Sequence, residues 1–152
     1  MLSLWPNLTP YFTNKSIAPV WQRWYSALVL NVNAAPSQIG TVTLDAQAAA
    51  IVTEPIPLPL SLPEGLYRLT YYLRKTVVGS TSTLTVTLGW TDGGVACTQT
   101  FAALTTNTTS ATQTNSVTVR SDAGAAFTYA LAYGSTGTAM QYAFDLRVEQ
   151  LP

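Results

Sequence analysis

Side chains able to perform acid–base, nucleophilic or metal chemistry are few in this sequence. Its carboxylates are Asp45, Glu54, Glu64, Asp92, Asp122, Asp145 and Glu149. It has no histidine, and Cys97 is the one cysteine. A Ser/His/Asp triad, a Cys/His pair, a zinc cluster and an intramolecular disulfide are therefore excluded.

One pair of carboxylates has a spacing that permits a catalytic interpretation. Asp145 and Glu149 flank Arg147, and in a β-strand these three side chains share one face. The pair is either an acid and a base that face a sugar, or part of a solvated face whose charges compensate one another. We favour the solvated face. Asp92 stands in a turn without the clustered acids of a calcium site, so the sequence assigns no catalytic residue, no metal and no cofactor.

Composition restricts the partners. The chain has 152 residues, of which 47% are hydrophobic and 9% charged, and its 7 Lys and Arg balance its 7 Asp and Glu. This length suits one domain with a short appendage. The charge balance argues against nucleic acid as a partner, since phosphate binding requires clustered Lys and Arg. Residues 1–6 contain neither a basic segment nor a long apolar run, so we expect no signal peptide, no membrane span and synthesis in the cytoplasm.

The pattern of the chain changes near residue 36. Residues 1–36 are predicted to be an N-terminal anchoring arm, in which an extended segment precedes a short amphipathic helix. Apolar residues after Pro19 recur at i, i+3, i+4 and i+7, which favours a helix, but a strand stays open for residues 20–32. The arm either binds a partner or packs on its own domain. Trp, Tyr and Arg dominate interface hot spots, and the selected partner-binding anchors are Trp5, Tyr11, Phe12, Trp21, Arg23, Trp24, Tyr25 and Leu28.

Residues 37–152 are predicted to form a single antiparallel β-sandwich, jelly-roll-like and all-β, with about eight strands. Apolar and polar side chains alternate in residues 66–75, 83–91, 126–133 and 141–149, as in strands that bury one face. Weaker strands are expected at 40–45, 49–53, 95–101 and 116–120. The sequence Asp92-Gly93-Gly94 predicts a tight hairpin between 82–91 and 95–103. This number of short strands suits a jelly roll or a similar sandwich.

Four further features carry local predictions. Proline at alternate positions of residues 55–63 predicts an edge strand or polyproline-like strap that directs Ile56, Leu58, Leu60 and Leu62 onto an apolar surface. The polar residues 104–115 are predicted to be a long loop. Residues 134–137 are predicted to be a hairpin loop, because they lack the lysine of a phosphate-binding loop. Cys97 is expected to be a small buried hydrophobe.

Parts of the sequence resemble structural proteins of tailed bacteriophages. Residues 17–28, with Pro19, Trp21, Arg23, Trp24 and Tyr25, resemble the N-terminal segment of short structural proteins that these phages encode. Residues 65–72, 89–93 and 140–149 resemble jelly-roll domains of phage fibre and capsid-decoration proteins. The resemblance implies a location in the virion and a homotrimer whose β-domains pack side by side, anchored to the particle by the arm. It carries over no catalytic residue.

The leading hypothesis is a non-enzymatic virion protein that decorates or cements the capsid, with the major capsid protein or another virion protein as its partner. Side-by-side association is expected to use the aromatic and alanine faces of residues 126–133 and the hydroxyl face of the strand at residues 84–90. The alternative is a tail-fibre or receptor-binding head domain that recognises host surface glycans through the loops at 104–115 and 134–139. A glycan-cleaving enzyme built on Asp145 and Glu149 ranks third.

Overall fold

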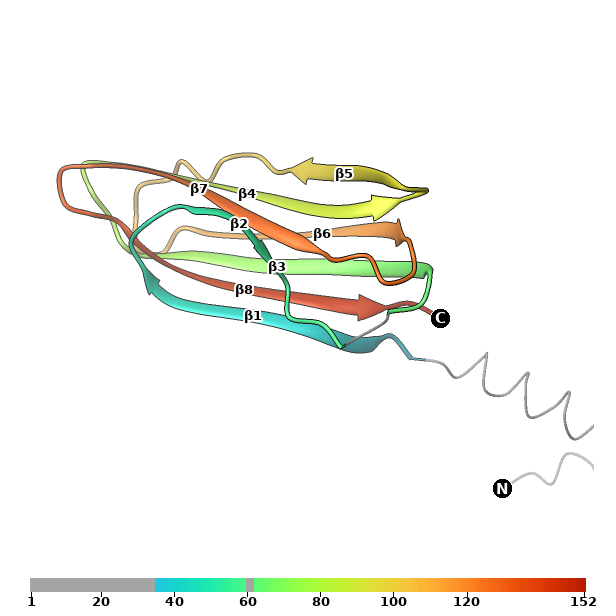
Figure 1. Ribbon diagram of the computed structural model, residues 1–152. Coiled ribbons are helices and arrows are strands. Elements are labelled where there is room, and N and C mark those ends of the chain that lie inside the picture. The colour runs from blue at the N-terminus through green and yellow to red at the C-terminus, as the bar shows by residue number, and fades with distance from the viewer. Residues whose placement is uncertain (1–34, 60–61) are drawn as a thin grey trace, which may run out of the picture. The chain divides into compact units, whose positions relative to one another are not determined.

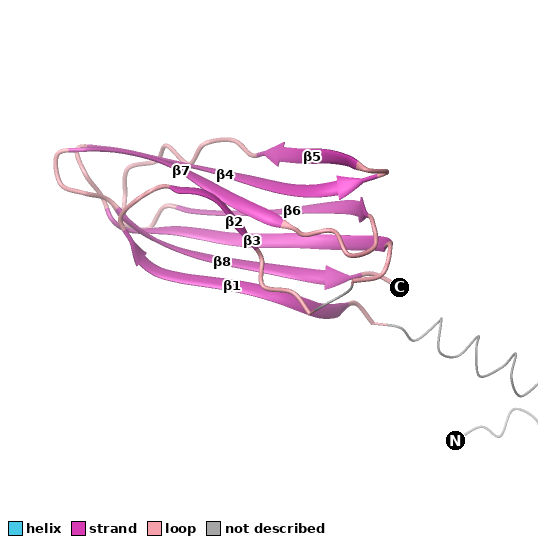
Figure 2. Ribbon diagram, in the orientation of Figure 1, coloured by secondary structure: helices cyan, strands magenta, loops and turns pink. Residues whose placement is uncertain are grey.

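Eight strands, all paired antiparallel, make up the part of the chain that the structure describes, residues 35–59 and 62–152 (Figures 1 and 2). In this computed structural model no helix occurs among those residues. The strands are β1 (Ser37–Gln47), β2 (Ile51–Pro55), β3 (Gly65–Val77), β4 (Thr81–Asp92), β5 (Val95–Thr100), β6 (Thr112–Ser121), β7 (Thr128–Thr136) and β8 (Gln141–Gln150). The predicted arm and helix lie outside the described residues up to residue 34, so the division at residue 36 stays a prediction.

The strands form two sheets whose order follows one simple rule. Sheet A has the order β1-β8-β3-β6 and sheet B the order β2-β7-β4-β5. β1 pairs with β8, β2 with β7, β3 with β6 and β4 with β5, so the chain is one long hairpin centred on the β4–β5 turn. The hairpin is rolled up, with successive pairs in alternate sheets, and the β3–β8 and β4–β7 pairings close the roll. This is a jelly roll, and the predicted sandwich is confirmed.

Alternation along the strands builds the core between the sheets. On β3 every second side chain is almost fully buried, whereas Leu66 and Tyr72 on the opposite face are 49% and 40% exposed. The predicted strand faces on β3, β4, β7 and β8 are confirmed by the buried residues Tyr67, Leu69, Tyr71, Leu73, Leu84, Val86, Leu88, Tyr129, Leu131, Tyr142, Phe144, Leu146 and Val148. The rings of Tyr129 in sheet B and Phe144 in sheet A stack with centroids 5.8 Å apart. Such pairs add specific geometry to the apolar burial that stabilises the sandwich.

A lysine continues the buried face of β3. Lys75 is fully buried, and its Nζ donates hydrogen bonds to the carbonyl oxygens of Ser82, at 2.6 Å, and Thr106, at 2.8 Å. Burial lowers the pKa of this ammonium. The side chain fastens the segment after β5 to the sandwich through the backbone, a role that alternation alone does not reveal.

The turn at the centre of the hairpin is held by an aspartate from another loop. Gly93 and Gly94 have φ of +59° and +75°, the left-handed region that glycine adopts without strain. The Asp122 carboxylate, between β6 and β7, accepts their backbone N–H groups at 2.8 and 2.7 Å. The Asp122 N–H in turn donates to the carbonyl oxygen of Thr91 at 3.0 Å. These backbone hydrogen bonds, with a smaller contribution from nearby Arg120, hold the pKa of Asp122 below its usual value.

The proline-rich strap also behaves largely as predicted. Its first residues belong to β2, an edge strand of sheet B, where Pro55 needs no ladder donor. Ile56 and Leu62 are buried and Leu58 is packed against the core, while Leu60 lies outside the described residues. The strap approaches β1 at Gly40, where an added Cβ would lie 2.9 Å from the carbonyl oxygen of Pro57. The close approach explains why glycine occupies this position.

Three local predictions are corrected. The loop expected at 104–115 is shorter, because residues 112–115 extend β6 by pairing with β3, and Leu104 forms a bridge with Leu84. Residues 134–137 are not a hairpin loop, because 134–136 end β7 in sheet B and the chain then crosses to β8 in sheet A. Cys97 is only half-buried, because β5 is an edge strand with little cover.

The two ends of the sandwich carry different connections. β1 begins at Ser37 beside Gln150, where β8 ends, so the chain enters and leaves the domain at one end. We call this the proximal end. It also carries the β2–β3, β4–β5 and β6–β7 connections, whereas the distal end carries the β1–β2, β3–β4, β5–β6 and β7–β8 connections (Figure 1).

Replacing Asp122 by Asn should lower the thermal unfolding midpoint, because one oxygen that accepts a glycine N–H becomes an amide donor. The lowered pKa means that this stabilisation is present above the unfolded-state pKa of about 3.9 and is lost as pH falls through the folded-state pKa. The Asn variant should therefore lose less stability on acidification. Circular dichroism melts from neutral pH to about pH 2 test this, with Asp45→Asn as the control, because Asp45 is exposed and forms no ion pair with the described residues. Equal midpoints and equal acid dependence for wild type and variant would show that Asp122 does not hold the turn.

Candidate binding surface

The outward side chains of sheet A are arranged in rows across the four strands. One row runs from Thr43 on β1 through Asp145 on β8 and Tyr72 on β3 to Thr114 on β6. The next row consists of Thr41, Arg147, Thr70 and Ser116, which are matched across the same strands. Pairing of β8 with β3 thus brings together residues more than 70 positions apart in the sequence.

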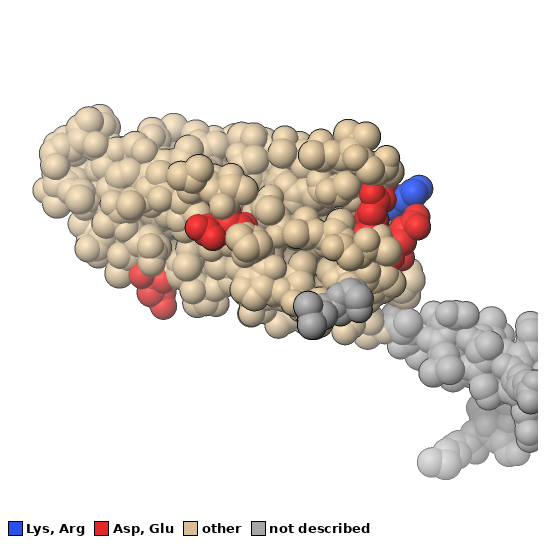
Figure 3. All heavy atoms as spheres, in the orientation of Figure 1, with Lys and Arg blue, Asp and Glu red and all other residues tan. Residues whose placement is uncertain are grey.

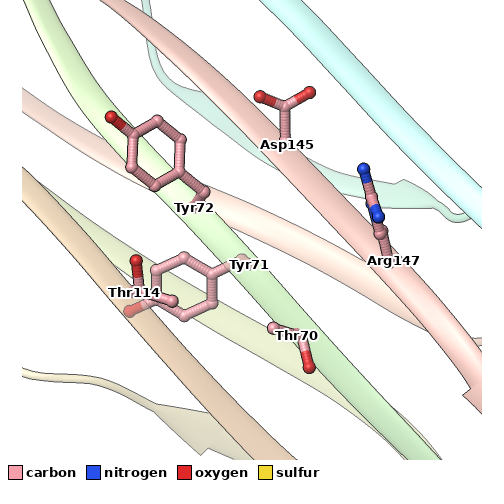
Figure 4. A pocket seen from close by; sticks show the side chains of 6 residues that line it. All are labelled: Thr70, Tyr71, Tyr72, Thr114, Asp145 and Arg147. Carbon is pink, nitrogen blue, oxygen red and sulfur yellow. The ribbon is translucent and has the colours of Figure 1, made fainter.

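These rows enclose a shallow groove, which we call the sheet A groove. Its larger part, of about 430 Å³, is lined by Thr70, Tyr71, Tyr72, Thr114, Asp145 and Arg147 (Figure 4). A smaller hollow of about 170 Å³ shares Asp145 and Arg147 and continues across β8 to Thr41 and Thr43. Figure 4 shows the ring of Tyr72 face-on, with the Asp145 carboxylate and the Arg147 guanidinium along one side of it. Tyr71 contributes from the core side, where Asn115 donates to its hydroxyl at 3.1 Å.

Charges on this face are paired unequally. Arg68 stands opposite Glu149, and its Nη2 and Nε lie 2.6 and 2.7 Å from Glu149 Oε2. Asp145 and Arg147 stand opposite Tyr72 and Thr70 instead, and neither forms an ion pair with any residue that the structure describes. The groove therefore offers an acceptor carboxylate and a donor guanidinium that are free of one another.

The structure separates the carboxylates that the sequence suggested as a catalytic pair. With a strand rise of about 3.3 Å, four residues place Asp145 and Glu149 about 13 Å apart. Glycosidase carboxyl groups are about 5–9.5 Å apart, and Glu149 is engaged by Arg68. The sequence suggested that Arg147, on the same strand, compensates the charge of Glu149. In the structure the compensating charge comes from Arg68 on the neighbouring strand.

The outer face of sheet B has a different chemistry. All its outward positions on β4, β5 and β7 are small and uncharged: Thr81, Thr83, Thr85, Thr87, Gly89, Thr91, Ala96, Thr98, Thr100, Thr128, Ala130, Ala132, Gly134 and Thr136. Hydroxyls pair across it, as in Thr87–Thr100 at 2.9 Å and Thr81–Thr136 at 2.7 Å. We call this surface the threonine face. It contains the hydroxyl and alanine faces that the sequence suggested for self-association. The aromatic face suggested with them is not available, because Phe127 and Tyr129 are buried in the core.

Charged groups otherwise gather at the proximal end. Arg120 Nη2 lies 3.1 Å from Glu64 Oε1, and Arg120 Nε lies 3.4 Å from Asp92 Oδ1, close to the β4–β5 turn. In Figure 3, acidic and basic atoms meet at the right-hand end of the visible face, and the rest of the described surface on that face is uncharged except for two acidic patches. Within residues 35–59 and 62–152 no group of three His, Cys, Asp or Glu is placed to hold a metal ion. No helix in that part of the chain is long and apolar enough to cross a membrane.

The sequence-predicted anchors and the groove fall in different parts of the chain. All eight anchors, from Trp5 to Leu28, lie outside the described residues, so their role stays a prediction. The sequence placed Tyr72, Thr70 and Arg147 correctly on outward faces but assigned them no role. The one feature of the sequence that could have indicated the groove was Tyr72, a large aromatic residue on a polar strand face.

Comparisons with known proteins find solved structures of low similarity and no family. No protein-family model matches the sequence, and no match is found among the curated proteins. Among solved structures, Eiger TNF from S. frugiperda is 10% identical, with 78% of this chain and 94% of that chain covered and a TM-score of 0.37. The carbohydrate-binding module CBM6cm-2 of Cellvibrio mixtus lichenase 5A, in complex with cellotriose, is 16% identical over 76% and 91% of the chains, with a TM-score of 0.30. A family 16 carbohydrate-binding module is 11% identical over 79% and 85%, with a TM-score of 0.32. These are likenesses to β-sandwich structures.

A double-mutant cycle should distinguish the two charge pairs. Arg68→Gln and Glu149→Gln should couple by about 0.5 kcal/mol in urea unfolding, the usual size for a partly exposed ion pair. Asp145→Asn and Arg147→Gln should show no coupling and should each change stability by less than about 0.5 kcal/mol. Coupling between Asp145 and Arg147 as large as that of the first pair would mean that they neutralise each other and are not available to a ligand.

Proposed function

We propose that the protein is a non-enzymatic structural protein of a tailed-phage virion that decorates or cements the capsid as a homotrimer. The arm of residues 1–36 attaches it to the major capsid protein or to another virion protein. The β-sandwich of residues 37–152 associates with two further copies and faces outward. The sequence resemblance of residues 17–28 and of the three sandwich segments supports the virion location, and the geometry of the domain supports the mode of assembly.

The threonine face is the observation that carries the proposal. A face made only of Thr, Ala and Gly presents no charge whose desolvation would oppose contact with an identical face. Its small side chains allow backbones to approach, and its methyl groups give apolar area. Sheet A bears unpaired charges and a protruding tyrosine, so the threonine face is the better surface for side-by-side association of copies.

Chain polarity agrees with anchoring by the arm. Because Ser37 begins β1 next to the end of β8, the arm joins the domain at the proximal end. The distal connections lie at the other end of the sandwich from this junction. The two outer sheet faces extend along the strands between the two ends (Figure 1). The threonine face and the sheet A groove are built from residues of the sandwich alone, on different sheets.

The second candidate function is a tail-fibre or receptor-binding head that recognises host surface glycans. The sequence placed that recognition in two loops, and both are at the distal end of the sandwich. Within the β5–β6 and β7–β8 connections the one aromatic residue is Phe101, which packs edge-to-face on Tyr71 with centroids 5.1 Å apart. The loops thus present no free ring for stacking on a sugar. The specific observation that favours this candidate is the sheet A groove with Tyr72.

A charged substitution on the threonine face should dissociate the trimer. Ala132→Arg places a charge opposite Thr85 without disturbing the core, because Ala132 is exposed. Sedimentation equilibrium is expected to give three copies for the wild type and one for the variant, and the control Thr118→Arg, on sheet A, should remain trimeric. A monomeric wild type, or a variant that stays trimeric, would contradict association through this face.

Electron microscopy of parent particles labelled with an antibody against this chain tests the location. Label over the shell is expected, and deletion of residues 1–30 should abolish binding to particles that lack the protein. Label confined to the tail end would instead favour the receptor-binding head. Unchanged particle binding by the truncated chain would show that the arm is not the anchor.

A further inference from the structure

Tyr72 is an exposed aromatic residue on the outer face of sheet A. Its side chain is 40% exposed in the middle of a sheet face rather than at a loop or an edge. Large aromatic residues carry most of their stabilising value when buried, so an exposed ring flanked by polar residues gives the fold little. Among the six side chains drawn in Figure 4, the ring of Tyr72 turns its face toward the viewer, and none of the other five lies in front of it. An open aromatic face attracts the weakly positive C–H groups of a flat ligand, because the π-system is negative above the ring.

The polar groups around this ring complete a donor and acceptor set. Asp145, directly opposite Tyr72, accepts hydrogen bonds only, and Arg147, one outward position further along β8, donates only. Threonine hydroxyls at 43 and 114, which do both, close the row on either side. A ligand that carries many hydroxyl groups, each a donor and an acceptor, can use all of these groups at once.

From these observations we infer that the sheet A groove binds a neutral carbohydrate chain, with a sugar ring stacked on Tyr72 and its hydroxyls bonded to Asp145 and Arg147. This inference rests on the second candidate function above and moves the recognition site from the distal loops to the sheet. It also holds for a capsid-decorating protein that contacts the host surface.

Size and shape agree with an oligosaccharide. The volume of about 430 Å³ falls in the range of small-ligand sites, about 300–1,000 Å³. With strands about 4.8 Å apart, the row from Thr114 to Thr43 spans three steps, about 14 Å. The groove is open along this row and shallow, so it suits a chain that crosses the strands and not a molecule that must be enclosed.

Other ligand classes fit less well. The larger hollow is lined by one carboxylate and one guanidinium, so it has no net charge with which to concentrate an anion or a cation. An extended peptide adds to a sheet edge through free backbone groups, but β3 and β8 are inner strands whose backbones are paired on both sides. A second copy of the chain would have to desolvate Asp145 and Arg147, which the threonine face avoids.

Binding is tested on the full-length protein by ¹⁵N–¹H NMR with neutral tetrasaccharides of glucose, galactose, mannose and N-acetylglucosamine at millimolar concentration. At least one should shift the amide signals of Tyr72, Asp145, Arg147 and Thr114. Tyr72→Ala should weaken the affinity at least tenfold, Tyr72→Phe should retain it, and Asp145→Asn should weaken it. The control Thr118→Ala, on the same sheet outside the groove, should bind as the wild type does.

Several results of the NMR experiment would contradict carbohydrate binding in the groove. The inference is overturned if no neutral tetrasaccharide shifts the groove signals, if Tyr72→Ala binds as well as wild type, or if the shifts lie only in the distal loops. Binding of a trisialic acid alone, without any neutral sugar, would overturn the neutral class. Because the measurement uses free protein, its failure is separate from the failure of capsid decoration, which the particle labelling decides. Unfolding melts of each variant confirm that a loss of binding is not a loss of fold.

Discussion

Strict side-chain alternation on a fixed register is the constraint from which both surfaces follow. The inner strands β3, β8, β4 and β7 each bury most side chains of one face, whereas the edge strands β2 and β5 have no fully buried residue. A slip of one residue on β3 would expose its buried tyrosines and leucines and bury its arginines. The β4–β5 turn sets the centre of the long hairpin, and Asp122 ties that turn to the β6–β7 connection. With the centre fixed, the pairs β3–β6, β2–β7 and β1–β8 follow outward in order. The outer faces are then determined by residues that the core does not constrain.

The outer faces of the two sheets carry different kinds of side chain. On β4, β5 and β7, sheet B presents hydroxyl and methyl groups with no charge, whereas its edge strand β2 carries the exposed Val52 and Glu54. Sheet A presents charges, hydroxyls and one exposed aromatic ring. A sandwich of this kind can associate with copies through one face and meet a ligand through the other, without either contact disturbing the core. The two surfaces lie on different sheets and share no residue, so the proposed assembly and the inferred binding are compatible.

Local patterns predicted the parts of the fold that depend on local rules. Alternation on β3, β4, β7 and β8 identified strands and faces, and Gly93-Gly94 identified the central hairpin. Strand partners were not predictable, because pairing β3 with β8 depends on contacts between residues more than 60 positions apart. The same dependence explains the errors: residues 112–115 are polar enough for a loop, and they are a strand only because β3 supplies a partner. Lys75 was missed for a related reason, since its acceptors come from two other segments.

Register also explains why the groove has free charges although Asp145 and Arg147 are neighbours on one face. Arg68 meets Glu149 because the β3–β8 register places them directly opposite, where guanidinium and carboxylate reach each other. The same register places Tyr72 opposite Asp145 and Thr70 opposite Arg147, so each charge has an uncharged partner across the strand. Along β8 the two are one pleat apart, about 6.6 Å between Cα atoms, with no ion pair between them. In the row of Arg68 and Glu149 the two charges neutralise each other. In the next two rows along β8, Arg147 and Asp145 have no charged partner opposite and remain available to a ligand.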